Sequence, residues 1–160
     1  MNPALLIAIV FLFATASNSV AGQSNSHSRS FESQLRCRED PAAGKLLMDL
    51  QAGGYIDRTY IVEDTINYFK LLRPLVVLGF RPVAVFGFQE GYENFFERGP
   101  GTLPPEMIGI VVRGNQDSVK LRLRNLGIHN LEVEPHAYNT NGRVARSGLV
   151  SIACWSTREK

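Results

Sequence analysis

Residues 74–88, PLVVLGFRPVAVFGF, decide the fold class because they hold two apolar runs rich in β-branched residues, at 75–78 and 83–88. Gly79-Phe80-Arg81-Pro82 separates the runs, and Pro82 lacks the amide hydrogen that a central strand donates. We therefore expect either a tight hairpin or one long bent strand with Pro82 at an edge or a bulge. In both arrangements this stretch belongs to a β-sheet.

Further strands are expected on both sides of this stretch. Residues 58–72 mix β-branched, aromatic and polar residues without one apolar face, so we expect a break or bulge around Glu63-Asp64. Three later segments also read as strands, namely the continuous apolar run 107–112, the alternating segment 128–135 and the C-terminal segment 149–155. The tetrad at 139–142, Asn-Thr-Asn-Gly, is typical of a hairpin turn.

Two helices are expected. Asp40-Pro41 is a typical helix start, and apolar residues at 43, 46, 47 and 50 follow at helical spacing, so the first helix should span about 41–52. The second should span 115–126, with Val119, Leu123 and Leu126 on its buried face and Gly127 as its C-terminal cap. The order of elements predicts one α+β domain, an antiparallel sheet of about five strands with two helices packed on one face.

The N-terminal segment has the pattern of a secretory signal. Residues 4–14, ALLIAIVFLFA, are eleven apolar residues in a row, whereas a membrane span needs about 20. Small residues at 14 and 16 and at 19 and 21 give two cleavage points, and we predict removal of residues 1–21. The alternative is an uncleaved anchor, and the absence of Lys or Arg before the apolar run counts against a signal. After cleavage we expect a disordered lead-in at 22–36, rich in Ser, Asn and Gln, then the domain at 37–160 with no transmembrane span.

The two cysteines, Cys37 and Cys154, stand near the two ends of the predicted domain. In an oxidising compartment they are the available pair, so we expect a disulfide in a periplasmic or secreted protein. Closing a loop of this size stabilises a fold by about 4 to 5 kcal/mol in the chain-entropy model. The alternative is two separate buried thiols.

Composition and motifs exclude several function classes. The formal net charge of +2, with both signs mixed along the chain, does not resemble a nucleic-acid binder. His129 and His136 are seven residues apart, which points them to opposite faces of a strand, so neither a metal nor a cofactor is expected. The sequence favours a non-enzymatic protein. The enzymatic alternative is a small exported hydrolase that uses Glu63 or Asp64 with His136. A serine nucleophile, Ser147 or Ser151 with His136 and an acid such as Glu63, has no supporting motif in the sequence.

The segment 89–105, QEGYENFFERGPGTLPP, is the candidate binding site. Tyr92, Phe95, Phe96 and Arg98 stand in an otherwise polar or Gly/Pro-rich loop, and these residue types dominate protein interfaces. The alternative is that the phenylalanines fold back over the sheet. A second candidate is the helix at 115–126, whose cations Lys120, Arg122 and Arg124, with Arg113, could face an anion or lipid headgroup or form a solvated surface.

These observations lead to one functional hypothesis with two alternatives. We expect an exported, non-enzymatic module that binds another protein, such as an inhibitor or immunity-type factor or an accessory protein of an envelope complex. The alternatives are the hydrolase and a carrier of a small apolar ligand. The sequence leaves the oligomeric state and the strand order open.

Overall fold

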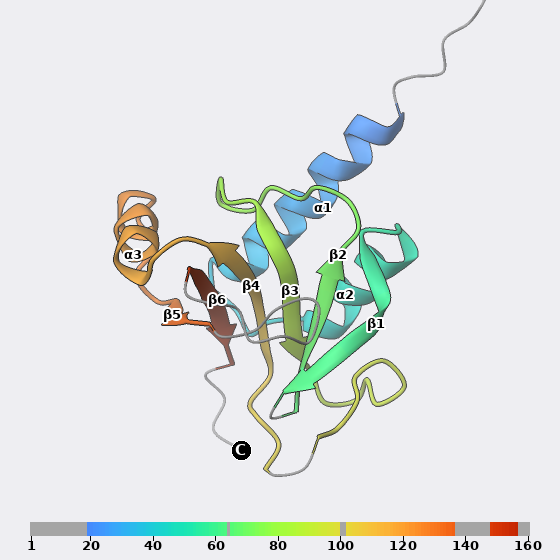
Figure 1. Ribbon diagram of the computed structural model, residues 1–160. Coiled ribbons are helices and arrows are strands. Elements are labelled where there is room, and N and C mark those ends of the chain that lie inside the picture. The colour runs from blue at the N-terminus through green and yellow to red at the C-terminus, as the bar shows by residue number, and fades with distance from the viewer. Residues whose placement is uncertain (1–18, 64, 100–101, 137–147, 157–160) are drawn as a thin grey trace, which may run out of the picture.

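The computed structural model describes residues 19–63, 65–99, 102–136 and 148–156, which form an α+β fold (Figure 1). Within these ranges there are three α-helices and six strands. The helices are α1 (Ser19–Leu35), α2 (Ala43–Ala52) and α3 (Gln116–Asn125), and the strands are β1 (Ile56–Glu63), β2 (Ile66–Leu71), β3 (Pro82–Phe88), β4 (Met107–Arg113), β5 (Glu132–Pro135) and β6 (Leu149–Trp155). None of the described helices is both long and apolar enough to cross a membrane.

All pairs in the six-stranded sheet are antiparallel, and the strand order is β1-β2-β3-β4-β6-β5. The first four strands follow one another as a meander. After β4 the chain passes through α3 to the edge strand β5. Strand β6 then returns and lies between β4 and β5. The predicted antiparallel sheet is confirmed, with six strands instead of about five and with a third helix.

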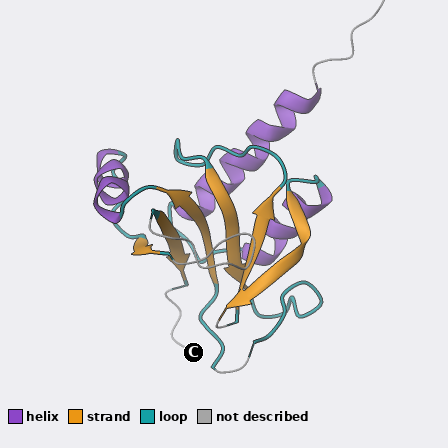
Figure 2. Cartoon of the chain, viewed as in Figure 1, coloured by secondary structure: helices purple, strands orange, loops and turns teal. Residues whose placement is uncertain are grey.

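Helices α1 and α2 cover one face of the sheet, whereas α3 packs against the edge strand β5 (Figures 1 and 2). The close approach of α2 depends on Gly87 in β3, because a Cβ there would lie 3.2 Å from both the Ala43 Cβ and the Leu47 Cδ1 atom. The predicted pair on one face, the helices at 41–52 and 115–126, is therefore wrong, because α1 and not α3 lies beside α2. The second helix of that layer is α1, which the sequence did not indicate.

Helix α1 corrects the predicted disordered lead-in at 22–36. Its composition is polar, but Phe31 and Leu35 are fully buried and the Glu32 Oε1 atom accepts a hydrogen bond of 2.8 Å from the Leu78 amide. Two apolar anchors one turn apart are enough to fix the C-terminal half of the helix on the core. The proposed signal sequence falls on residues 1–18, outside the described part, and on the first turn of α1.

The start of α2 also differs from the prediction. The helix begins at Ala43, and Ala42 offers no side-chain cap. Two glutamines from elsewhere in the chain replace it, because the Oε1 atoms of Gln34 and Gln89 accept hydrogen bonds from the amides of Ala42 (2.8 Å) and Gly44 (2.7 Å). Asp40, the predicted cap, accepts instead from the Ser156 hydroxyl at 2.9 Å.

Two predictions within the meander can be compared with the structure. The expected break is present, because β1 ends at Glu63 and β2 begins at Ile66, with Thr65 at φ +73°, whereas the register irregularity of this strand pair lies earlier, between Ile56 and Tyr60. Residues 75–78 form no strand, because Val77 and Phe80 exchange two backbone hydrogen bonds of 3.0 and 2.8 Å around a tight turn. The predicted irregularity at Pro82 is present as a register shift between Pro82 and Ala84.

The C-terminal half follows its sequence signals closely, except that the strand predicted at 128–135 is shortened to β5, Glu132–Pro135. Strand β6 has the predicted bounds, and Asn115 caps α3 by accepting a hydrogen bond of 2.8 Å from the Ser118 amide. Gly127 follows the helix at φ +70°, as expected of a C-terminal glycine. Leu126 is the exception, because it is 44% exposed and does not join Val119 and Leu123 in the core. The predicted turn at 139–142 lies outside the described residues.

The disulfide between Cys37 and Cys154 is confirmed, with the Cα atoms 5.4 Å apart. It joins the end of α1 to β6. The Asn130 side chain reinforces this junction, because its Nδ2 atom donates to the Cys37 carbonyl at 2.8 Å. The C-terminal end of α1 is thereby tied to β6, a strand that the helix also contacts.

The sheet is strongly curved. The His136 ring, which follows β5, lies 5.1 Å from the Tyr68 ring of β2, although three strands separate β2 from β5 in the sheet. Tyr68 in turn packs on Phe86 at 5.0 Å, and the Phe86 ring lies over Gly109 of β4. The face of the sheet that carries Tyr68 and Phe86 is therefore concave, and these aromatic rings fill its middle.

Candidate functional site

The connection between β3 and β4 contains neither helix nor strand in its described residues, 89–99 and 102–106, as the sequence predicted. Its first half folds onto the same face of the sheet as α2. Tyr92 lies against α2 so closely that a Cβ at Gly44 would overlap the tyrosine ring. The segment is thus anchored to α2 through Tyr92, although several of its residues, Arg98 among them, are exposed.

The buried side chain of Asn67 holds this segment in place. Its Nδ2 atom donates to the carbonyls of Thr65 and Glu97, each at 3.0 Å, and its Oδ1 atom accepts from the Glu97 amide at 2.8 Å. Asn67 is fully buried, so these groups would otherwise be desolvated without partners. One side chain therefore fixes the backbone of Glu97 to β2 as a neighbouring strand would.

The predicted aromatic residues fold back, which was the alternative to an exposed binding loop. Phe95 is half-buried and stacks on Phe69 with ring centroids 5.3 Å apart. Phe96 is only 3% exposed and meets Phe95 edge to face at 5.0 Å. Tyr92 is half-buried and Arg98 is exposed. The aromatic rings thus build the support of a site, and little of their surface is free to contact a partner.

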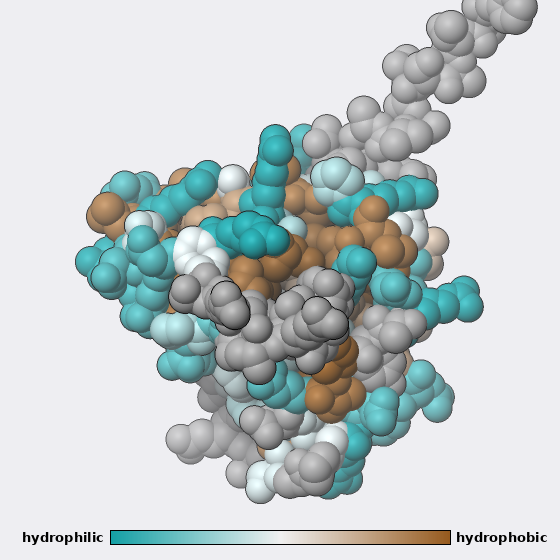
Figure 3. Space-filling model, in the orientation of Figure 1, coloured by the Kyte–Doolittle hydropathy of each residue, from teal (hydrophilic) through white to brown (hydrophobic). Residues whose placement is uncertain are grey.

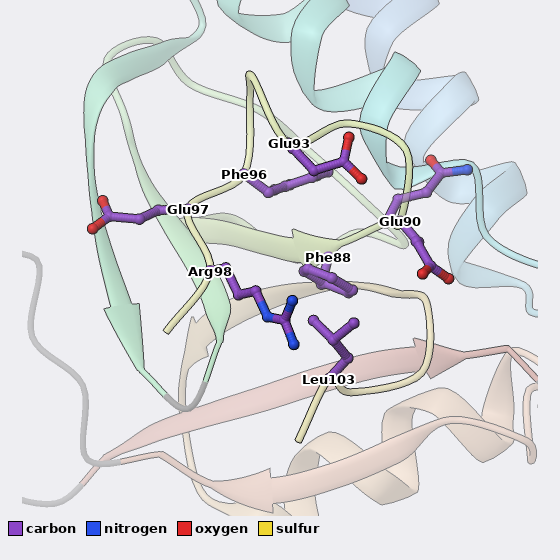
Figure 4. A pocket seen from close by; sticks show the side chains of 8 residues that line it. Phe88, Glu90, Glu93, Phe96, Glu97, Arg98 and Leu103 are labelled. Atoms are coloured by element: carbon purple, nitrogen blue, oxygen red, sulfur yellow. The ribbon is translucent and has the colours of Figure 1, made fainter. Parts of the chain in front are cut away.

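This folding leaves a pocket of about 360 Å³ at the end of β3 (Figure 4). Of the four predicted residues, Phe96 and Arg98 line it, whereas Tyr92 and Phe95 do not. The other lining residues are Phe88, Gln89, Glu90, Glu93, Glu97 and Leu103. Sequence reasoning missed these six, although the acidic residues spaced through 90–97 were a visible signal.

The pocket has an apolar floor and a charged rim. Phe88 and Phe96 are buried, Leu103 is half-buried, and Figure 4 shows the Arg98 side chain extending toward Leu103. Glu90, Glu93 and Glu97 also line the pocket, and their carboxylates lie apart from one another, with that of Glu97 directed away from Phe88 (Figure 4). Three carboxylates against one guanidinium make the rim net negative.

Two hydrogen bonds make the rim rigid on the side of α2. The Gln89 side chain accepts from the Gly44 amide, as described above, and the Glu93 Oε1 atom accepts from the Gly91 amide at 3.1 Å. Gly91 has φ +85°, a conformation that favours glycine. The pocket wall is therefore connected to the start of a helix and to a fixed turn.

The carboxylates do not form a metal centre. Across the described ranges, no three His, Cys, Asp or Glu side chains are grouped so that they could hold a metal ion. The spread of the three glutamates in Figure 4 agrees with this. Their arrangement suits the recognition of a cationic group.

The residues of the predicted hydrolase are only partly described. Glu63 is exposed at the end of β1, and both Asp64 and Ser147 lie outside the described residues. His136 is half-buried against Tyr68, and burial lowers the pKa of its imidazole. The Ser151 hydroxyl donates to the Glu134 carbonyl at 3.4 Å. The hydrolase hypothesis therefore stays a prediction.

The predicted cationic cluster on α3 is divided by the structure. Lys120 and Arg124 line a shallow hollow together with His129, on the side of β5. Arg122 and Arg113 instead line a separate groove at the start of β3.

Comparison of the chain with known protein families, with curated proteins and with solved structures finds no match in any of the three. Functional inference therefore depends on the chemistry of the residues described above.

Proposed function

We propose that this protein is an exported, non-enzymatic module that binds another protein, and that the pocket at 88–103 receives a side chain of the partner. The observation that carries the proposal is the combination of an apolar floor with a net negative rim on a rigid support. Recognition sites join a desolvated apolar centre to a polar rim in this way.

The size and charge of the pocket define the partner segment. A volume of about 360 Å³ is at the lower end for ligand pockets and suits one or two side chains. The floor favours an aliphatic or aromatic group, and the rim favours a neighbouring ammonium or guanidinium group. The partner should therefore present an apolar residue next to Lys or Arg.

Export is the second part of the proposal. The Cys37–Cys154 bond supports it, because cytosolic reductants keep most such thiols reduced. The apolar run at 4–14 followed by small residues supports it from the sequence. Intact mass of protein recovered from its native source should show residues 1–21 removed, and a mass that retains them would refute cleavage.

The binding proposal is tested with two capped dipeptides, N-acetyl-Leu-Lys-amide and N-acetyl-Leu-Glu-amide, titrated into ¹⁵N-labelled protein. The lysine probe should shift the amide resonances of residues 88–103 saturably, and the glutamate probe should bind at least about threefold more weakly, since each exposed charge pair contributes up to about 1 kcal/mol. Equal affinity of the two probes, or shifts spread over the whole protein, would contradict the proposal.

A matched pair of double variants separates the pocket from general charge effects. Glu90→Gln/Glu97→Gln removes two rim carboxylates, whereas Glu132→Gln/Glu134→Gln removes two exposed carboxylates from β5 at the edge of the sheet. Only the first pair should weaken binding of the lysine probe. Equal weakening by both pairs would show that net charge, not the pocket, governs binding.

The apolar floor also supports the carrier alternative. Phe88, Phe96 and Leu103 could hold a small apolar molecule without any partner protein. Native mass spectrometry of freshly purified protein distinguishes the two functions, because a carrier should retain a small molecule of defined mass that denaturation releases.

A further inference from the structure

A basic groove lies at the opposite end of β3 from the acidic pocket. It has a volume of about 590 Å³, and three arginines from three parts of the chain line it, namely Arg81 before β3, Arg113 at the end of β4 and Arg122 on α3. The remaining lining residues are Gly79, Phe80, Pro82, Val83 and Val112. None of these eight described residues carries a carboxylate.

The groove is separate from the proposed protein-binding pocket. Phe88 lines the pocket and Pro82 lines the groove, and these residues are the two ends of β3. Six residues of extended chain place the two sites about 20 Å apart. Ligands of the two sites therefore need not compete.

Arg122 is held in position before any ligand arrives. Its Nη2 atom donates to the Gly79 carbonyl at 2.8 Å, and its guanidinium carbon lies 4.5 Å from the centroid of the Phe80 ring. Gly79 has φ +73°, and a Cβ at this position would overlap the guanidinium group. The tight turn between Val77 and Phe80 thus provides a seat for this arginine.

The other two arginines are exposed and complete the site. Arg81 lies two residues after Gly79, which holds Arg122. Arg113 follows Val112, and Val112 pairs with Pro82 across the β3–β4 ladder. An anion bound between the three guanidinium groups would offset their mutual repulsion. Guanidinium groups bind phosphate and sulfate oxygens through paired N–H donors, so an oxyanion fits this arrangement.

We propose that this groove binds a phosphate or sulfate group carried on a larger molecule. The volume exceeds the need of a bare ion, and the half-buried Pro82 and Val83 offer apolar contact to the part that bears the anion. Both a soluble phosphate ester and the headgroup of an anionic lipid have this chemistry. Space-filling atoms in Figure 3 show hydrophilic and hydrophobic surface interleaved along the upper part of the molecule, where α3 and the start of β3 lie.

The test uses two probes that share the phosphate group. Glycerol 1-phosphate is titrated by calorimetry at constant ionic strength, and vesicles of phosphatidylglycerol are compared with vesicles of phosphatidylcholine in a sedimentation assay. Saturable binding of glycerol 1-phosphate assigns a soluble ester, and binding to phosphatidylglycerol vesicles alone assigns a lipid headgroup. Binding of neither probe would overturn the proposal.

Matched variants decide whether the groove is responsible. Arg81→Gln/Arg113→Gln removes two exposed arginines of the groove and leaves the seated Arg122 in place. Lys120→Gln/Arg124→Gln removes the same charge from the other side of α3. The first pair should weaken the probe that binds by about tenfold or more, since charge-assisted hydrogen bonds are lost, and the second by less than about twofold. Equal losses would overturn the proposal, and thermal denaturation of both variants confirms that they are folded.

Discussion

Replacement of Asn67 by Ala should destabilise the fold and release the segment that walls the pocket. Three hydrogen bonds disappear, those to the carbonyls of Thr65 and Glu97 and from the Glu97 amide. At about 1 kcal/mol net for each bond, the free energy of unfolding should fall by about 3 kcal/mol. Because Asn67 is fully buried, water cannot replace these bonds without opening the segment.

Two measurements follow the effect. Urea denaturation monitored by circular dichroism gives the change in unfolding free energy, and hydrogen exchange of the Glu97 amide reports the local release. In Asn67→Asp the acceptor for the Glu97 amide remains, but the two donated bonds are lost and a carboxylate faces two carbonyl oxygens. That variant should therefore be at least as unstable as the alanine variant, although its volume is unchanged.

A matched control is Asn125→Ala at the exposed end of α3, which should change the unfolding free energy by less than about 0.5 kcal/mol. The reasoning would be refuted if Asn67→Ala lost no more stability than this control. It would also be refuted if the Glu97 amide exchanged at the same rate in wild type and variant. A loss of stability with unchanged exchange would show that the cavity, not the hydrogen bonds, is responsible.

Three further predictions concern other parts of the fold. Reduction of the Cys37–Cys154 bond, or Cys37→Ser/Cys154→Ser, should lower the unfolding free energy in urea by about 5 kcal/mol, because the bond spans 117 residues of sequence; a loss below about 1 kcal/mol would contradict the entropic argument. Gly109→Ala should cost about 1 to 3 kcal/mol, since the new methyl group would meet the Phe86 ring and lie 2.6 Å from the Ile152 carbonyl oxygen; Phe86→Leu in the same chain should recover part of the loss, and strictly additive effects would argue against that contact. Burial lowers the pKa of His136 below its ordinary value of 6.5, so the unfolded state binds the proton more readily and stability should fall as the pH drops below about 6.5. In His136→Gln this part of the pH dependence should vanish, and an unchanged profile would assign it to other groups.

Local patterns determined those elements whose signals lie within a few residues of each other. The bounds of β4 and β6 follow from short apolar runs, and the cap of α3 follows from an asparagine three residues before the amide that it binds. The disulfide pair followed because a chain with two cysteines allows one intramolecular pairing. In each case the physical cause is contained in the sequence itself.

The candidate site was predicted only in its location. The segment 89–105 was identified, but its phenylalanines became the support of a pocket because Phe69 offered a buried surface for stacking. The glutamates form the rim of a pocket only because β3 and the following segment fold around an apolar floor. A linear pattern does not reveal which side of an aromatic ring will be covered.

Long-range contacts decided the remaining features. Helix α1 has a polar composition typical of a disordered segment, and it is ordered because Phe31 and Leu35 are buried on the sheet and Cys37 is bonded to β6. The start of α2 is capped by glutamines from α1 and from the residue after β3, and Arg122 is seated by a glycine 43 residues away. The sequence by itself therefore determined the compartment expectation, the disulfide pair and most strands, whereas the helical layer, the pocket and the basic groove depend on groups that only folding brings together.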